Sequence, residues 1–105
     1  MTDKEIKNIQ EIKEYVDSRE TQSTGAYNVW KADVTYESYG LQTQNLRNVE
    51  ILYQYSDIPQ IIINSFNPPY YSVFDPRYQS FKYDGTNLDI TGVDNKGNKY
   101  KVTIK

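Results

Sequence analysis

The 105-residue sequence contains no cysteine and no histidine. Without cysteine the chain forms no disulfide, has no thiolate nucleophile and cannot hold a metal through sulfur. Without histidine it lacks the side chain that titrates near neutral pH and is also the commonest metal ligand. An enzyme built on this chain would have to use carboxylates, hydroxyls, lysine or an oxygen-bound metal. No motif for such chemistry is present, so we expect a protein that is not an enzyme and needs no cofactor or metal.

Aliphatic residues are also scarce. The hydrophobic set makes up 37% of the sequence, and 11 tyrosines belong to it. A chain of this length forms one domain, 1–105, with a single core. That core must include tyrosine rings, each of which needs a partner for its hydroxyl group.

The net charge of −2 offers no excess of Lys and Arg, which argues against general nucleic-acid binding. No apolar run approaches the roughly 20 residues that span a bilayer, and the N-terminus lacks the apolar segment of a signal peptide. We therefore expect a cytoplasmic protein that does not associate with membranes. The four commonest residue types, Tyr, Ile, Asn and Lys, have A/T-rich codons, which is typical of low-GC bacteria and of their phages and mobile elements.

Two turns near the C-terminus predict the register of three strands. Asp84-Gly85 lies between two alternating apolar and polar stretches, a strong signal for a two-residue type I′ turn. Such a turn pairs Tyr83 with Thr86, and counting outward pairs Phe81 with Leu88. This register places the large apolar side chains on one face of the hairpin.

The second turn contains Asn95-Lys96-Gly97. A three-residue loop with Gly97 in the left-handed conformation pairs Leu88 with Ile104 and Ile90 with Val102. The same register sets Gly92 opposite Tyr100, whose ring can cover the gap that a strand glycine leaves. The resulting meander has one apolar face, which needs a cover, and one polar face that carries Tyr78 and the lysines of these strands.

The N-terminal stretch, about 2–17, has a helical pattern. Thr2 and Glu5 have the spacing of a capping box, and apolar residues recur at intervals of three and four. The apolar stripe consists of Ile6, Ile9, Ile12 and Val16. We expect this helix to cover the apolar face of the meander.

Seven strands are predicted, and they alternate with turn signals. They span about 26–37, 48–56, 60–66, 70–74, 78–83, 87–93 and 98–104. Trp30 on the first is interpreted as a core anchor, and the strand 60–66 is apolar on both faces, which is typical of the middle of a sheet. The predicted fold class is α+β, with one N-terminal helix packed on a bent antiparallel sheet of five to seven strands in meander order, cystatin-like or cone-like by analogy.

Two short motifs have simpler explanations than the functions they suggest. Asp94 to Asn98 superficially suggests a calcium loop, but it lacks the acidic positions of an EF-hand, and a hairpin turn explains each of its residues. Pro68-Pro69-Tyr70-Tyr71 matches the PPxY spelling of ligands for WW domains. Inside a folded domain it is better interpreted as a rigid connection between strands.

The leading functional hypothesis rests on aromatic residues. Tyr70, Tyr71, Phe74, Arg77 and Tyr78 lie within nine residues and are of the types that dominate protein interfaces. We expect a non-enzymatic protein-binding module, an inhibitor or accessory protein of a phage or mobile element, that contacts its partner through this segment.

Two alternatives stay open. If the helix and the bent sheet enclose a pocket, Trp30, Tyr36, Tyr53 and Tyr55 would line it, and the protein would bind a small ligand. The other alternative is a homodimer formed through an edge strand, for which the apolar run Ile61 to Ile63 is the candidate.

Overall fold

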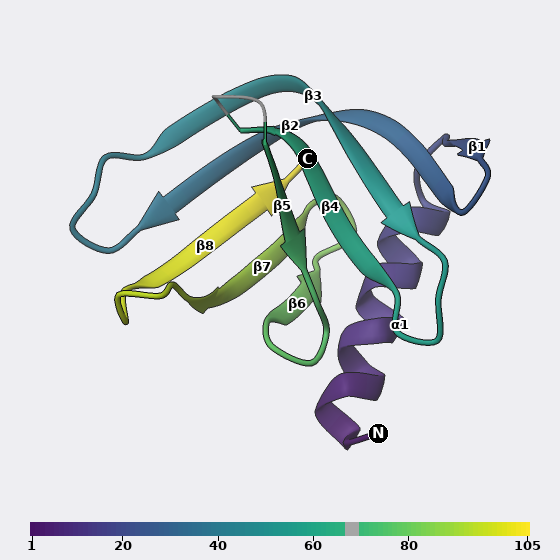
Figure 1. Ribbon diagram of the computed structural model, residues 1–105, viewed down its shortest axis with the longest axis horizontal. Helices are drawn as coiled ribbons and strands as arrows, with labels where there is room; N and C mark the ends of the chain where they lie inside the picture. The colour runs from purple at the N-terminus through teal and green to yellow at the C-terminus, as the bar shows by residue number, and fades with distance from the viewer. Residues whose placement is uncertain (67–69) are drawn as a thin grey trace.

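The computed structural model describes residues 1–66 and 70–105 (Figure 1). This part of the chain forms a helix followed by a series of antiparallel strands. The elements are α1 (Asp3–Asp17), β1 (Gln22–Thr24), β2 (Tyr27–Ser38), β3 (Gln44–Gln54), β4 (Gln60–Phe66), β5 (Tyr70–Phe74), β6 (Ser80–Tyr83), β7 (Leu88–Val93) and β8 (Lys99–Ile104).

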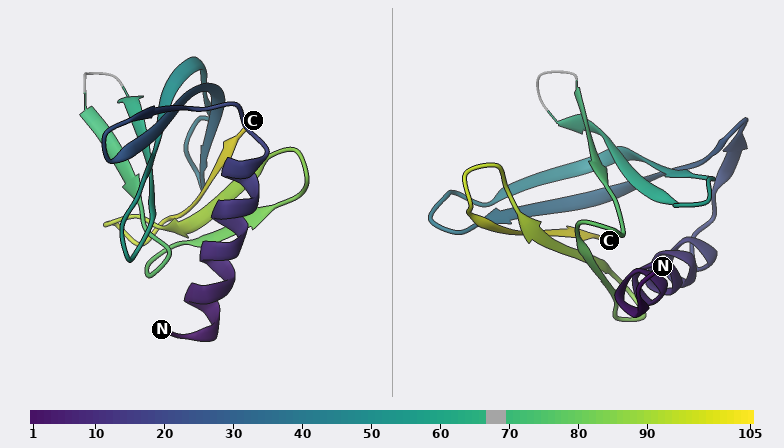
Figure 2. Two further views of the ribbon diagram at one scale, coloured as in Figure 1. Left: turned by 90° about the vertical axis from the view of Figure 1, so that its right-hand side faces the viewer. Right: turned by 60° about the horizontal axis from the view of Figure 1, so that its bottom comes forward.

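The strands form one antiparallel sheet in the order β5-β4-β3-β2-β8-β7-β6, with β1 paired to the start of β2. Two meanders, β2 to β5 and β6 to β8, are joined because the C-terminal strand β8 pairs with β2. The meander order therefore holds within each half but not across the join. The sheet curls into a half-barrel with α1 beside β6 and β7 (Figure 2), which confirms the α+β class and the helix packed on a bent sheet.

A β-bulge bends the sheet between β2 and β3. Ala32 pairs with Val49 and Val34 with Leu46, so two residues of β3 stand opposite the single Asp33. Asn48 adopts a positive φ of 54°, and the backbone N–H of Asn48 donates a hydrogen bond to the Asp33 carboxylate (2.9 Å). Such bulges increase the local twist of a strand pair.

The bulge also explains where the predicted strand boundary is wrong. β3 begins at Gln44, not near residue 48, because an extra residue interrupts the alternation that would have revealed the strand. The short strand β1 was not predicted, since Gln22, Ser23 and Thr24 are all polar and exposed.

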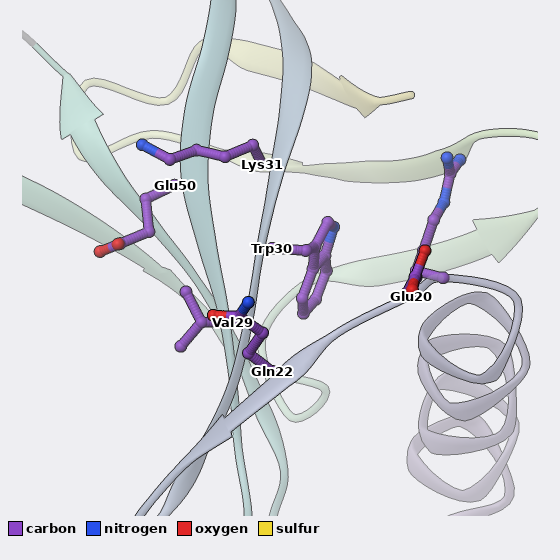
Figure 3. A pocket seen from close by; sticks show the side chains of 7 residues that line it. Glu20, Gln22, Val29, Trp30, Lys31 and Glu50 are labelled. Carbon is purple, nitrogen blue, oxygen red and sulfur yellow. The ribbon is translucent and has the colours of Figure 1, made fainter.

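Side chains alternate between the two faces of the curled sheet. Figure 3 shows the Trp30 ring directed toward the side of α1, whereas Val29, Lys31 and Glu50 project from the opposite face. The concave face encloses the core. Trp30 is 7% exposed and donates a hydrogen bond from Nε1 to the Tyr15 hydroxyl (3.4 Å), which confirms it as a core anchor.

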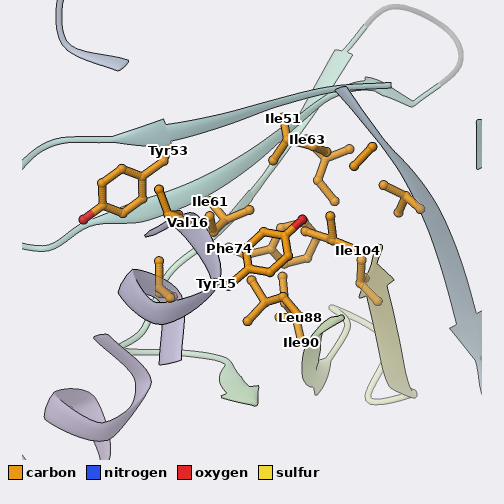
Figure 4. Close-up of a cluster of buried hydrophobic side chains, with 14 of the residues drawn as sticks. Tyr15, Val16, Ile51, Tyr53, Ile61, Ile63, Phe74, Leu88, Ile90 and Ile104 are labelled. Atoms are coloured by element: carbon orange, nitrogen blue, oxygen red, sulfur yellow. The ribbon is translucent and has the colours of Figure 1, made fainter. Parts of the chain in front are cut away.

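The core consists mainly of aliphatic side chains around the Tyr15 ring (Figure 4). Its fully buried members include Ile12, Ile51, Ile61, Ile63, Leu88, Ile90 and Ile104. Since β4 pairs with β3 on one side and β5 on the other, Ile61 and Ile63 lie in an interior strand, as its two apolar faces predicted. The hypothesis that this run forms an edge for dimerisation is therefore wrong.

Helix α1 begins as predicted, but it is rotated about its axis. The Thr2 hydroxyl accepts a hydrogen bond from the Glu5 N–H (3.2 Å), the expected N-cap. The buried face contains Asn8, Ile12, Tyr15 and Val16, while Ile6 of the predicted stripe is 43% exposed.

Hydrogen bonds of Asn8 account for this rotation. Its side-chain amide donates to the carbonyl oxygens of Pro76 (3.0 Å) and Gln79 (2.9 Å), and its carbonyl oxygen accepts from the Phe81 N–H (3.1 Å). One side chain thus satisfies three backbone groups of the β5–β6 connection and of β6. A buried amide with all these partners cannot be turned toward solvent without leaving them unpaired.

The turn at Asp84-Gly85 differs from the prediction. Tyr83 pairs with Leu88 and Phe81 with Ile90, so the loop has four residues and each partner is displaced by two positions. Within this turn only Gly85 has a positive φ (93°), whereas a type I′ turn needs two such residues. The Asp84 carboxylate accepts from the N–H groups of Thr86 (2.8 Å) and Asn87 (2.7 Å), and these bonds favour the longer turn. A shift of two keeps every side chain on its predicted face.

The second turn is confirmed. Leu88 pairs with Ile104, Ile90 with Val102 and Gly92 with Tyr100, and Gly97 has a φ of 84°. The Tyr100 ring lies directly over Gly92. A Cβ atom at position 92 would lie 2.6 Å from the Tyr100 hydroxyl oxygen and 2.8 Å from Cζ, so the ring occupies the space of the missing side chain.

We predict that Gly92→Ala displaces the Tyr100 ring and lowers the free energy of unfolding by about 2 kcal/mol, as expected for overpacking. Urea denaturation measures the change, and Thr91→Ala, on the opposite face of the same strand, is the control. With Tyr100→Ala as background, Gly92→Ala should cost much less. If Gly92→Ala lowered the free energy of unfolding equally with and without the Tyr100 ring, a clash with that ring would not be the cause of the loss.

We also predict that Asn8→Ala lowers the free energy of unfolding by about 3 kcal/mol, because it leaves buried backbone groups of three residues without partners. Gln10→Ala, an exposed position on the same helix, is the matched control. A loss for Asn8→Ala no larger than that of the control would contradict the proposed role of this amide.

Candidate functional site

The structure separates the residues of the predicted contact segment. The side chains of Tyr70 and Tyr71 lie outside the described residues. Phe74 is 5% exposed and its ring stacks at 6.4 Å on Tyr100, so it belongs to the core and cannot contact a partner. The prediction for Phe74 is wrong because β5 curls over the concave face and turns this residue inward. Tyr78, by contrast, is 71% exposed.

A buried aspartate holds the turn that carries Tyr78 through hydrogen bonds. Asp75 is 5% exposed, and its carboxylate accepts hydrogen bonds from Gln60 Nε2 (2.9 Å) and from Arg77 at the backbone N–H (2.8 Å), Nε (3.1 Å) and an Nη atom (2.9 Å). The backbone N–H groups of Tyr78 and Gln79 both donate to the Asp75 carbonyl oxygen (3.0 Å each). The turn that carries Tyr78 is therefore fixed on both sides.

Arg77 connects this turn to the exposed ring. Two of its guanidinium nitrogens are held by Asp75, and its Cζ lies 5.2 Å from the centroid of the Tyr78 ring. Cation–π contacts at exposed sites contribute about 0.5–1 kcal/mol. The arrangement limits the motion of the ring, so binding would order it at a low entropic cost.

Tyr78 borders a hollow of about 470 Å³ lined by residues of α1, β6, β7 and β8. Val93, an exposed apolar residue, stands opposite Lys99 in the strand register, and both line this hollow. Lys4 reaches it from the first turn of α1. The remaining lining residues are Ser80, Thr91, Gly92 and Tyr100.

A second hollow of about 370 Å³ adjoins the first and shares Lys99 and Tyr100 with it. Tyr39, 85% exposed, lines this hollow together with Lys101. The backbone N–H of Tyr39 donates to the Lys99 carbonyl oxygen (3.0 Å), which fixes the β2–β3 loop beside β8. Glu37, Ser38 and Thr43 complete the lining.

The surface that spans the two hollows is called here the lysine–tyrosine band. It consists of Lys4, Tyr78, Val93, Lys99, Lys101 and Tyr39. Tyr100 forms part of its floor, and burial raises the pKa of this phenol, which keeps it neutral. Sequence reasoning named Tyr78 alone among these as a site residue. Val93 carried a usable signal, because a large apolar residue on a polar face is a mark of binding surfaces.

The four residues of the alternative pocket line different regions. Tyr53 and Tyr55 line an open groove of about 410 Å³ between α1 and the β3–β4 loop, with Ile9 on the helix side. Tyr36 packs against Tyr100, with ring centroids 5.8 Å apart. Trp30 lines a separate hollow, so the four side chains do not meet around one ligand.

The hollow beside Trp30 measures about 490 Å³ and is shown in Figure 3. Its lining combines Arg19 and Lys31 with Glu20 and Glu50, so charges of both signs balance. The Arg19 guanidinium lies 4.8 Å from the Tyr15 ring centroid and donates to the Thr86 carbonyl oxygen (2.5 Å). This arginine ties the end of α1 to the β6–β7 turn, which is a structural role.

The outer face of the other half of the sheet carries an apolar row. Val29, Leu52, Ile62 and Val73 stand opposite one another across β2 to β5. Among them Val73 is 41% exposed, and the others are partly covered by neighbouring side chains.

Neither metal ligands nor membrane helices appear among the described residues. No three His, Cys, Asp or Glu side chains within residues 1–66 and 70–105 are grouped so that they could hold a metal ion. In the same part of the chain no helix has both the length and the apolar character to cross a membrane.

The support of Tyr78 predicts a specific pH dependence. Hydrogen bonds from the Arg77 side chain hold the pKa of Asp75 below its ordinary value, although burial acts in the opposite direction. A carboxylate with a lower pKa in the folded state stabilises the fold fully above its unfolded pKa of about 3.9, and this contribution is lost as the pH falls through the folded pKa.

We therefore expect Asp75→Asn to lose stability at pH 7 and to show a shallower decline than the wild type between about pH 5 and about pH 2, the range over which such a carboxylate titrates. Asp84 and Asp94, whose pKa values are lowered by backbone N–H groups, are present in both proteins and do not affect the difference. Urea denaturation across this range is the measurement, with Asp57→Asn on an exposed loop as control. Parallel pH profiles for Asp75→Asn and wild type would contradict the assignment.

Comparison with protein-family models, with curated proteins and with solved structures finds no match to this chain.

Proposed function

We propose that the protein is a non-enzymatic binding module that recognises another protein through the lysine–tyrosine band. The observation that carries this proposal is the exposed Tyr78 ring, which rests on Arg77 and through it on the buried Asp75. Side chains with large exposed area and restricted motion make the strongest interface contacts, and Tyr and Arg are enriched at such positions.

The neighbourhood of Tyr78 fits the same role. Val93 adds exposed apolar surface, and Tyr39 supplies a second exposed ring across the shared Lys99. An interface needs a central apolar contact with polar groups around it, and the band provides both. Two adjoining hollows favour an extended segment of a partner over a single compact side chain.

Other parts of the surface support this role less well. The apolar row on β2 to β5 borders a hollow that is lined by one tyrosine, Tyr27, but by no arginine and no charged residue. The groove at Tyr53 and Tyr55 favours a second candidate function, the binding of a small apolar ligand between α1 and the β3–β4 loop. It is open to solvent along α1, whereas small-ligand sites enclose most of the ligand surface.

Three expectations from the sequence remain part of the proposal. An inhibitor or accessory protein of a phage or mobile element in a low-GC bacterium remains our interpretation of the source and role. The cytoplasmic location expected from the N-terminal sequence likewise stays a prediction. A homodimer through an edge strand also stays a prediction, but it would not involve Ile61 to Ile63, which lie in the interior strand β4.

Affinity capture from the source cell, followed by calorimetry with the purified partner, tests the proposed function. We expect Tyr78→Ala and Tyr39→Ala each to weaken binding by about 30-fold, the equivalent of about 2 kcal/mol for a hot-spot residue. Tyr55→Ala, at a 50% exposed tyrosine outside the band, is the matched control and should bind like wild type. Circular dichroism and urea midpoints establish that each variant is folded.

The opposite result would assign the binding site to a different surface. If Tyr55→Ala lost binding while both band variants kept it, the groove beside α1 would be the functional surface. Wild-type affinity in all three variants would contradict a tyrosine-based interface on either surface.

A further inference from the structure

We infer that the segment recognised by the lysine–tyrosine band is acidic and extended, with carboxylates that pair with Lys4 and Lys99. This inference rests on the proposed function and adds the chemistry of the partner. It follows from how charge is distributed over the molecule, which has a net charge of −2 but a cationic band.

The outer face of the C-terminal meander carries an excess of positive charge. Lys82, Lys99 and Lys101 project from β6 and β8, and Asp89 is the carboxylate on the same face of these strands. Asp89 lies 3.7 Å from Lys101, so its charge is matched within the protein. Lys4 adds a further cation at the β6 margin of this face.

The two remaining carboxylates of the meander line neither hollow of the band. Asp84 and Asp94 lie in the two turns, where each accepts hydrogen bonds from backbone N–H groups. These bonds lower the pKa of both side chains, so they stay ionised. Burial, and to a smaller extent the negative charge of Asp94, raises the pKa of Tyr100 on the floor of the band.

The hollow beside Tyr78 is suited to an anion. Lys4 and Lys99 both line it, and neither has an ion-pair partner in the part of the chain that the structure describes. Ser80 and Thr91 add hydroxyl donors. None of its eight lining residues is acidic, so a carboxylate entering this hollow would directly contact hydrogen-bond donors and positively charged groups.

The second hollow has a different preference. Glu37 lines it beside Lys101 and Tyr39, so its charges balance, and an uncharged or apolar residue is the better occupant. The band therefore predicts a polarity in its ligand, with acidic residues near Tyr78 and less polar ones near Tyr39.

A nucleic acid also carries negative charge, but the band suits it less well. Single-stranded nucleic acids carry a phosphate at every nucleotide and bind to rows of cations with aromatic rings on which successive bases stack. Here two cations without partners stand in one hollow, and Glu37 lies in the next. The two exposed rings lie on opposite sides of Lys99, not in adjacent positions.

Nuclear magnetic resonance titration of the ¹⁵N-labelled protein tests the inference. The probes are the blocked peptide Glu-Glu-Leu-Glu-Glu, its uncharged twin Gln-Gln-Leu-Gln-Gln and a short oligothymidylate. We expect the acidic peptide to shift the amide signals of Tyr78, Thr91, Val93 and Lys99, and to bind about tenfold more tightly than its twin. Raising the salt from about 50 mM to about 300 mM should weaken this binding, because the charges are exposed.

Charge reversal provides the matched control. Lys4→Glu combined with Lys99→Glu should abolish the difference between the two peptides. Lys13→Glu combined with Lys31→Glu makes the same change in net charge away from the band and should preserve the difference. Equal binding of both peptides, or signal shifts outside the band, would overturn the inference, and tighter binding of the oligothymidylate through Lys4 and Lys99 would assign the band to nucleic acid instead.

The outcome separates this inference from the proposed function. A cellular partner that needs Tyr78 and Tyr39 but binds equally well to the Lys4→Glu, Lys99→Glu variant would leave the binding function intact and refute the acidic segment. A partner whose binding depended neither on the two tyrosines nor on the two lysines would refute both the proposed function and the acidic segment.

Discussion

The backbone edge of β6 depends on side chains of α1. In an antiparallel sheet the last strand leaves alternate N–H and carbonyl groups without partners. Here Asn8 accepts from the Phe81 N–H and Glu11 accepts from the Tyr83 N–H, both at about 3 Å. Two residues one helical turn apart thus take the place of a neighbouring strand, which determines where the helix lies and how far it is rotated.

The same contact positions the proposed site. Asn8 also donates to the carbonyl oxygens of Pro76 and Gln79, and these residues flank Arg77 and Tyr78. Lys4 lies one helical turn before Asn8, on the same side of α1, and therefore reaches the hollow that Tyr78 borders. The binding surface is accordingly an extension of the packing between helix and sheet, since the residue that holds the helix in place also holds the turn that carries the ring.

Local signals in the sequence were sufficient for most of the elements. The cap at Thr2, the alternation of the strands and the match of Gly92 with Tyr100 depend on residues close together in the chain, and all three are present in the structure. The Asp84 turn was predicted two residues too short, because the competing hydrogen bonds of its carboxylate cannot be weighed from the order of residues.

Features that depend on distant residues were not predicted. The pairing of β2 with β8 brings Tyr39 next to Lys99, and nothing in either segment alone indicates this contact. Phe74 and Tyr78 are both aromatic residues beside the same turn, yet the curl of β5 buries the first and leaves the second exposed. Asn8 could have been noticed as a polar residue on the buried face of a helix, but its partners lie about 70 residues away in the chain.

The β2–β8 pairing and the docking of α1 on β6 both join segments that are about 70 residues apart in the chain. Val34 meets Ile104, the last strand residue, and Asn8 meets Phe81. During synthesis neither contact can form until the meander β6 to β8 has left the ribosome, because it follows α1 and β2 in the chain. Until then α1 and the first meander are expected to stay partly uncovered, and these long-range contacts favour slow folding.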